Sequence, residues 1–98
     1  MVFKMTANEF LKIILKKKNL KQAQVLREMN KRNMGDDGVP MNRQHISNII
    51  NGIRPLSPYM ARKFEIVLGL EKYSLVSIVG FPKEKGMEKL EKLDKFEV

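Results

Sequence analysis

The chain has 98 residues, of which 43% are hydrophobic and 31% charged, so one small domain with a modest core is feasible. It contains no cysteine, which excludes a disulfide framework, a thiolate metal site and a thiolate nucleophile. No apolar run approaches the roughly 20 residues needed to span a membrane, and residues 1–10 lack the long apolar stretch of a signal peptide. We therefore expect a soluble protein of the cytoplasm.

The positive charge of the chain is unevenly distributed. The formal net charge is +8, but residues 1–63 carry +9 and contain all five arginines, whereas residues 64–98 carry −1. This asymmetry favours a polyanionic partner for the first part of the chain. A lysine-rich surface that serves solubility alone would explain the charge about equally well, so charge by itself does not decide the function.

The first predicted helix begins after Thr6. A threonine followed three residues later by Glu9 is the pattern of a capping box, in which both side chains bond early backbone donors. Three lysines, residues 16–18, lie in the last turn, where their positive charge interacts favourably with the negative end of the helix dipole. They form a solvated end in the simpler interpretation and contact phosphate in the alternative. The residues expected on the buried face are Phe10, Ile13 and Ile14, with Leu15 at its flank.

The second predicted helix begins near Leu20 and extends to about Arg32. Its expected core residues are Val25, Leu26 and Met29. Residues 33–40, from Asn33 to Pro40, predict a loop because they combine Gly, Asp and Pro. Asp36 and Asp37 could suggest a calcium site, but the spaced oxygen ligands and distal Glu of an EF-hand loop are missing, so a turn is favoured.

The third predicted helix begins at Asn42, a favourable N-cap residue, and ends at Gly52. When successive residues are placed about 100° apart, one face consists of Ile46, Ile49, Ile50 and Ile53. The opposite face carries Gln44, Ser47, Asn48 and Asn51, with Arg43 at its edge. A helix that is merely soluble usually exposes Lys and Glu. Arg, Gln and Asn are instead the side chains that form paired hydrogen bonds with guanine and adenine edges in the DNA major groove.

Two more helices follow. The fourth starts with Ser57 as N-cap and Pro58 at its first position, and Gly69 is placed to close it. Its expected packing residues are Tyr59, Met60, Phe64, Val67 and Leu68. The fifth covers about residues 72–79, with Leu75, Val76, Ile78 and Val79 as its apolar residues.

The remaining residues, 83–98, alternate Lys and Glu over a thin apolar line. This line consists of Met87, Leu90, Leu93 and Phe96. The simpler interpretation is a solvated or frayed helix packed lightly on the domain. The alternative is a helix for dimerisation or for binding a partner.

The order of these elements resembles the phage repressor/Cro-type (Xre-like) helix-turn-helix family, with some resemblance to antitoxin-type repressors. The resemblance covers about residues 8–80, and its most specific part is the segment ISNIINGIRPLSPYMARKFEIVLGL, residues 46–70. Leu20-Lys21-Gln22, Val25-Leu26 and Met29 add to it. It implies an all-α, compact five-helix lambda-repressor-like helix-turn-helix DNA-binding domain over residues 1–82. Residues 83–98 would then be a charged amphipathic tail for dimerisation or partner binding.

The resemblance also implies roles for individual residues. Arg43 and Gln44 match base-reading positions at the start of the recognition helix, and Asn48 matches a base-reading position one turn later. Arg43 offers two donors suited to guanine O6 and N7, while each amide offers a donor and an acceptor suited to adenine. The residues expected to contact the DNA backbone or support the recognition helix are Gln22, Asn42, His45, Ser47, Asn51 and Arg54.

Three features depart from the family pattern. Twelve residues separate Met29 from Asn42, where the family usually has a short turn with a Gly. Lys21 stands where the family tends to have a Ser or Thr cap, and Ile50 occupies a position that is often polar. Because carboxylates near DNA would be repelled, we expect the loop with Asp36 and Asp37 to project away from the DNA.

The expected function is a sequence-specific DNA-binding transcriptional regulator, and repression is favoured over activation. We expect a homodimer on double-stranded DNA with an inverted repeat, in which two recognition helices face major grooves about 34 Å apart. The fifth helix and the tail are the expected dimer surface. The alternative is an antitoxin or protein-interaction module that binds a protein partner, such as a toxin or another regulator. The gene could belong to a bacterial chromosome, a plasmid or a phage.

An enzyme is not expected. His45 is the single histidine, and Ser47, two residues away on the same helix, points to a different face, so the two cannot act as base and nucleophile. No metal-ligand cluster and no phosphate-binding Gly loop is present, so no metal or cofactor is expected. RNA binding is disfavoured because the basic part lacks an aromatic stacking platform.

Overall fold

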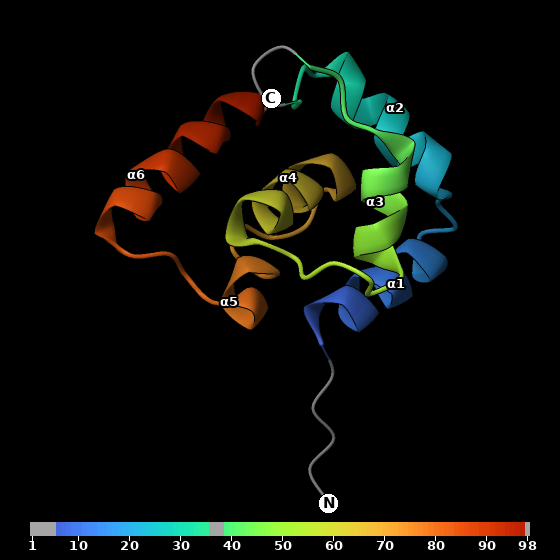
Figure 1. Ribbon diagram of the computed structural model, residues 1–98, viewed down its shortest axis with the longest axis horizontal. Helices are drawn as coiled ribbons and strands as arrows, with labels where there is room; N and C mark the ends of the chain where they lie inside the picture. The colour runs from blue at the N-terminus through green and yellow to red at the C-terminus, as the bar shows by residue number, and fades with distance from the viewer. Residues whose placement is uncertain (1–5, 36–38, 98) are drawn as a thin grey trace, which may run out of the picture.

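The computed structural model describes residues 6–35 and 39–97 (Figure 1). These residues form six α-helices, one 3-10 helix and no strand, which confirms the all-α expectation. The helices are α1 (Ala7–Lys17), α2 (Gln22–Lys31), α3 (Arg43–Ile50), α4 (Pro58–Leu68), α5 (Val76–Val79), α6 (Glu84–Glu91) and the 3-10 helix η2 (Lys92–Phe96). Among the described residues, no helix has the length and apolar character that a membrane crossing requires.

The predicted helix starts are confirmed by capping hydrogen bonds. The Thr6 hydroxyl accepts from the Glu9 backbone N at 3.1 Å, and the Asn42 side chain accepts from the Gln44 backbone N at 2.7 Å. The Ser57 hydroxyl caps α4 by accepting from the Met60 backbone N at 3.2 Å. Each bond satisfies one of the backbone donors that a helix leaves free at its first turn.

Helix α2 begins without a Ser or Thr cap. Lys21 is the N-cap residue, and its backbone N donates to the Gln24 side chain at 2.7 Å. Gln24 therefore supplies the reciprocal half of a capping box, while the half that a Ser or Thr side chain would supply is not made by Lys21.

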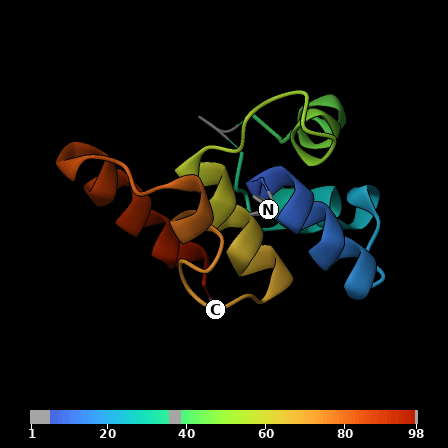
Figure 2. The ribbon, with the colours of Figure 1, turned by 90° about the horizontal axis from the view of Figure 1, so that it is seen from below.

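Helix α4 occupies the middle of the molecule. The two ribbon views place α1, α2 and α3 on one side of it and α5, α6 and η2 on the other (Figures 1 and 2). Helix α4 contacts α2, α5, α6 and η2, while α3 packs on α1 and α2. The buried side chains that surround α4 include Leu11, Val25, Met29, Ile46, Ile49, Leu75, Val76 and Leu90.

The buried face of α1 differs from the prediction. Leu11 and Leu15 are buried, Phe10 and Ile14 are half-buried, and Ile13 is 37% exposed. Five of the residues from 10 to 15 are apolar, so the sequence alone does not fix which of them face the core. The expectation that Ile13 is buried is therefore wrong, and Leu11 was missed.

The prediction that Ile53 belongs to the apolar face of α3 is also wrong. Ile53 is 71% exposed because α3 ends at Ile50, so the helical spacing that grouped Ile53 with the buried isoleucines no longer applies. Among the apolar residues of the short α5, Leu75 and Val76 are buried and Ile78 is 44% exposed. Ile50 stands at a position that is often polar in the family that the sequence resembles. Its side chain is buried here, which explains why it is apolar.

Helix α4 buries charged side chains that the sequence did not point to. Arg62 and Glu65 are both fully buried and form an ion pair at 3.1 Å. The Glu65 carboxylate also accepts from the backbone N of Tyr73, Leu75 and Val76, each at 2.8 Å. These bonds satisfy free donors at the start of α5, which explains how a four-residue helix is held in place.

The tail is part of the packed structure. Leu90 is fully buried, and the rest of the predicted apolar line packs against the core: Met87, Leu93 and Phe96. Arg62 bonds Asp94 at 3.1 Å and also pairs with Glu97, so the buried arginine holds η2 and the residue after it. The apolar side of the tail is therefore covered by the chain itself, and a partner of the tail would meet its Lys and Glu side chains. Its dimerisation or partner role stays a prediction.

Candidate nucleic-acid interface

Helix α3 presents a polar, uncharged face to the surface. Its three buried isoleucines, residues 46, 49 and 50, hold it against the helices below. On the opposite side Gln44 and Asn51 are exposed, and Ser47 and Asn48 are half-buried. Arg43 and Asn42 are exposed at the N-terminal end. The predicted separation of an isoleucine face and an amide face is therefore present in the folded chain.

The amide side chains of α3 bond one another along the helix. Gln44 Nε2 donates to Asn48 Oδ1 at 2.9 Å, and Asn51 Nδ2 donates to Ser47 Oγ at 3.1 Å. Both bonds link residues four positions apart, which neighbour each other on a helix surface. The first bond uses the Gln44 amide as donor, so the Gln44 oxygen remains available as an acceptor and the Asn48 NH₂ group as a donor.

The segment after α3 is fixed by a residue of α1 that the sequence did not single out. Asn8 Nδ2 donates to the carbonyl of Ile49 at 2.6 Å and to the carbonyl of Arg54 at 3.1 Å. The backbone N groups of Ile53 and Arg54 both bond the Asn48 carbonyl. Gly52, directly before Ile53, has a φ of 76°, a conformation that favours glycine. The Arg54 backbone is therefore fixed while its side chain is exposed.

The approach to α3 is fixed by Asn30 at the end of α2. Its side chain accepts from the Met41 backbone N at 2.7 Å and donates to the Met41 carbonyl at 3.3 Å. Met41 is buried and directly precedes the N-cap residue Asn42. This pair of bonds ties the end of the long connection to α2. Asp36 and Asp37, with their predicted turn and predicted direction, lie outside the described residues.

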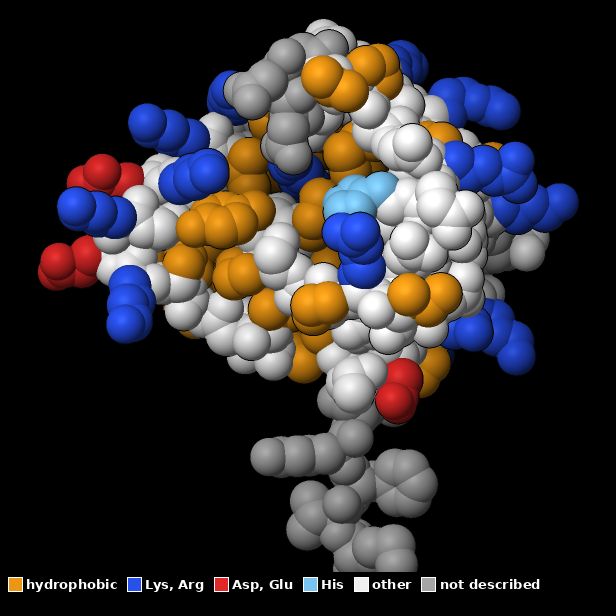
Figure 3. Space-filling model, in the orientation of Figure 1, with side chains coloured by type: hydrophobic (Ala, Val, Ile, Leu, Met, Phe, Trp, Pro, Cys, Tyr) orange, Lys and Arg blue, Asp and Glu red, His pale blue; other side chains and the backbone are white. Residues whose placement is uncertain are grey.

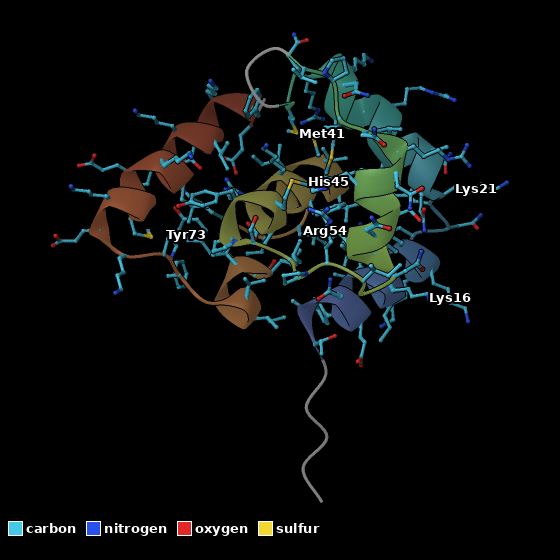
Figure 4. The ribbon with its side chains drawn as sticks, in the orientation of Figure 1. Lys16, Lys21, Met41, His45, Arg54 and Tyr73 are labelled. Atoms are coloured by element: carbon cyan, nitrogen blue, oxygen red, sulfur yellow. The ribbon has the colours of Figure 1, made fainter. Side chains whose placement is uncertain are left out.

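The other predicted residues fall at two borders of this face. In Figure 4, His45 of α3 and Arg54 of the following segment lie toward the centre of the face that is in view, whereas Lys16 and Lys21 lie at its edge, beyond α3. Asn42, Gln44, His45, Asn48 and Arg54 together line a shallow hollow. Gln22 is half-buried in the first turn of α2, and among the described residues no hydrogen bond joins its side chain to α3.

Two long stretches of the sequence, one of which contains α3, have no acidic residue. No Asp or Glu occurs between Asp37 and Glu65, or between Glu9 and Glu28, and Glu65 is buried. The second stretch contains lysines at 12, 16, 17, 18 and 21 and Arg27. Figure 3 shows the result: Lys and Arg side chains border a white polar surface on the right, and acidic side chains gather mainly at the left end, over α6. This charge pattern would attract a polyanion to the α3 side.

Comparisons with known proteins found no match to this chain among family models, curated proteins or solved structures. Among the described residues, no three His, Cys, Asp or Glu side chains lie close enough together to hold a metal ion. The functional argument therefore rests on α3, its borders and its charge.

Proposed function

We propose that the chain is a sequence-specific DNA-binding transcriptional regulator in which α2 and α3 act as a helix-turn-helix and α3 is the recognition helix. The observation that carries the proposal is the exposed face of α3, which consists of amide and hydroxyl groups with Arg43 at its end and no acidic side chain. A face meant for water alone has no need to exclude Glu, whereas a face that approaches phosphates does.

Three side chains supply the proposed base contacts. Arg43 presents its guanidinium at the exposed N-terminal end of α3, where recognition helices contact base edges. Gln44 and Asn48, joined at 2.9 Å, would together offer an acceptor and a donor to an adenine edge. Each good bidentate contact contributes about 1–3 kcal/mol of discrimination between bases.

Phosphate contacts come from the borders of the same face. Arg54 follows α3 on a backbone fixed by Asn8, and Gln22 lies in the first turn of α2. Lys16 and Lys21 stand at the far edge (Figure 4). Such contacts fix the register of the protein on DNA without reading its sequence, and they make the affinity depend on salt.

We further propose that the regulator binds an inverted repeat as a homodimer, because one short helix reads too few base pairs for specific binding. The resemblance makes repression the expected outcome. Ile78 and Phe81 are 44% and 51% exposed at the end of α5, so apolar side chains remain at the surface where the dimer contact is expected.

The test is selection of random duplex DNA by the purified protein, followed by titration of the enriched site at several salt concentrations. We expect an enriched inverted repeat and an affinity that falls steeply with salt. The Asn48→Ala variant should lose about tenfold in affinity for that site and little on unrelated DNA. Failure to enrich any sequence would refute the proposal and direct the search to a protein partner, as for an antitoxin or interaction module.

A further inference from the structure

A groove lies beside the candidate DNA interface, between α3, α4 and the tail. Its volume is about 440 Å³, within the range of small-molecule sites. The floor and walls are largely apolar, with Ile49, Tyr59, Met60 and Leu93 among the lining residues. Figure 3 shows these kinds of side chains as an apolar area next to the histidine at the centre of the face.

Among the described residues, the charged side chains that line the groove are all basic. They are Arg54, which follows α3, Lys63 of α4 and Lys89 of α6, and no described Asp or Glu lines the groove. The Lys89 ammonium lies 5.3 Å from the centre of the Tyr59 ring, so its charge is held at the apolar floor. Figure 4 shows Arg54 pointing into the same region. Among the described residues, neither Arg54 nor Lys89 forms an ion pair with an acidic side chain.

We propose that this groove binds a small organic anion, with its apolar body on Tyr59, Met60 and Leu93 and its carboxylate attracted by the basic lining residues Arg54 and Lys89. The two cations supply charge complementarity that an uncharged apolar ligand would not use. The volume favours a small molecule over a folded partner, which would cover a larger and flatter surface.

Such a ligand would also compete with DNA. A ligand carboxylate at Arg54 would place negative charge beside the phosphate that Arg54 is proposed to contact, and this consequence rests on the proposed function. Anion binding itself does not rest on it, because the groove is formed by α3, α4 and the tail in the absence of DNA.

The binding test is an NMR titration of the isotope-labelled full chain with phenylacetate, hydrocinnamate and octanoate, each compared with its neutral amide and with inorganic phosphate. We expect shift changes at Tyr59, Met60 and Leu93 with at least one of the three anions. The corresponding amide and phosphate should bind at least tenfold more weakly, since each lacks either the charge or the apolar body. No shift at these residues with any of the anions at millimolar concentration would overturn the proposal.

Matched variants separate the groove from general surface charge. Lys89→Gln and Arg54→Gln should each weaken anion binding about fivefold, as loss of a partly exposed ion pair does. Lys92→Gln removes the same charge from an exposed lysine of the same segment outside the groove and should change the affinity less than twofold. Equal weakening by Lys89→Gln and Lys92→Gln would overturn the proposal. The amide spectrum of each free variant verifies that it is folded.

The competition is tested separately on the selected DNA site. The bound anion should lower the apparent DNA affinity of the wild type, and Lys89→Gln should reduce this effect about fivefold. If no DNA site is selected, the proposed function fails while the titration still decides the groove. If DNA binds and the anion binds without changing the DNA affinity, the competition is refuted.

Discussion

Replacement of Arg62 by Met should destabilise the fold strongly through Glu65. Both side chains are fully buried, and the guanidinium bonds Glu65 at 3.1 Å, Asp94 at 3.1 Å and Glu97. Arg62→Met retains most of the apolar volume but leaves a buried carboxylate without its cation. Its destabilising effect therefore isolates the charge rather than the packing.

The size of the effect follows from what Glu65 retains. Breaking a buried ion pair by removing one partner costs about 3–5 kcal/mol. Glu65 keeps three backbone N–H donors, from Tyr73, Leu75 and Val76, so the lower end, about 3 kcal/mol, is expected. In a domain of this size a loss of about 1 kcal/mol lowers Tm by about 4–8 °C, so Arg62→Met should lower Tm by about 12–24 °C. This loss is a large part of a total stability of about 5–15 kcal/mol.

Urea unfolding followed by circular dichroism measures the effect, provided that the denaturant slope is unchanged. Asp94→Asn is the control, because Asp94 is about one-third exposed and its pair with Arg62 should contribute no more than about 1 kcal/mol. Glu65→Gln completes a double-mutant cycle, in which we expect non-additivity of about 2 kcal/mol between Arg62 and Glu65. Reasoning from a buried charge is refuted if Arg62→Met costs no more than Asp94→Asn, or if the two buried changes simply add.

Three further predictions concern the interface and the tail. Arg43→Ala should weaken binding to the selected DNA site by about tenfold and binding to unrelated DNA little; equal losses on both, measured by fluorescence anisotropy, would remove Arg43 from base reading. Gly86→Ala should destabilise the chain by about 1–3 kcal/mol in thermal unfolding, because the added Cβ would lie 2.6 Å from Pro82 Cβ and 2.8 Å from Tyr59 Oη; an unchanged Tm would contradict this packing. The hydrogen bond from Lys72, and then that from Arg62, lower the pKa of Asp94 below its ordinary value. The folded state thus binds this proton less readily than the unfolded state, so the stabilisation is present at neutral pH and is lost below about pH 4 as Asp94 becomes protonated. Asp94→Asn should flatten the acid limb of stability against pH, and an identical limb in both proteins would count against the assignment.

Local signals in the sequence predicted the starts of α1, α3 and α4 and the end of α4, whereas the helix predicted over residues 72–79 is limited to α5, Val76–Val79. Thr6, Asn42 and Ser57 each cap the helix predicted to follow, and Gly69 ends α4 with a φ of 68°. These signals depend on hydrogen bonds between residues two or three positions apart, so the local sequence contains them completely. The same holds for the two faces of α3, which follow from helical spacing alone.

Long-range partners could not be predicted in the same way. Glu65 is a charged residue on a helix, and nothing near it in the sequence indicates that it is buried against the start of α5. Asn8 bonds carbonyls more than forty positions away, and Leu90 is buried through packing of the tail on α4. Such contacts exist only after the helices are packed, and an isolated periodic pattern does not specify which neighbour covers it.

The long connection before α3 is the departure that bears most on the proposed function. A short turn positions a recognition helix by limiting the length of the chain between two helices. Here, twelve residues between Met29 and Asn42 remove that restriction. The two hydrogen bonds between Asn30 and the Met41 backbone restore a fixed point directly before the N-cap of α3. Asn8 fixes the other end of the helix through the carbonyls of Ile49 and Arg54. Because both ends are held by side chains of α1 and α2, the position of α3 no longer depends on the length of the loop, and a recognition helix remains compatible with the insertion.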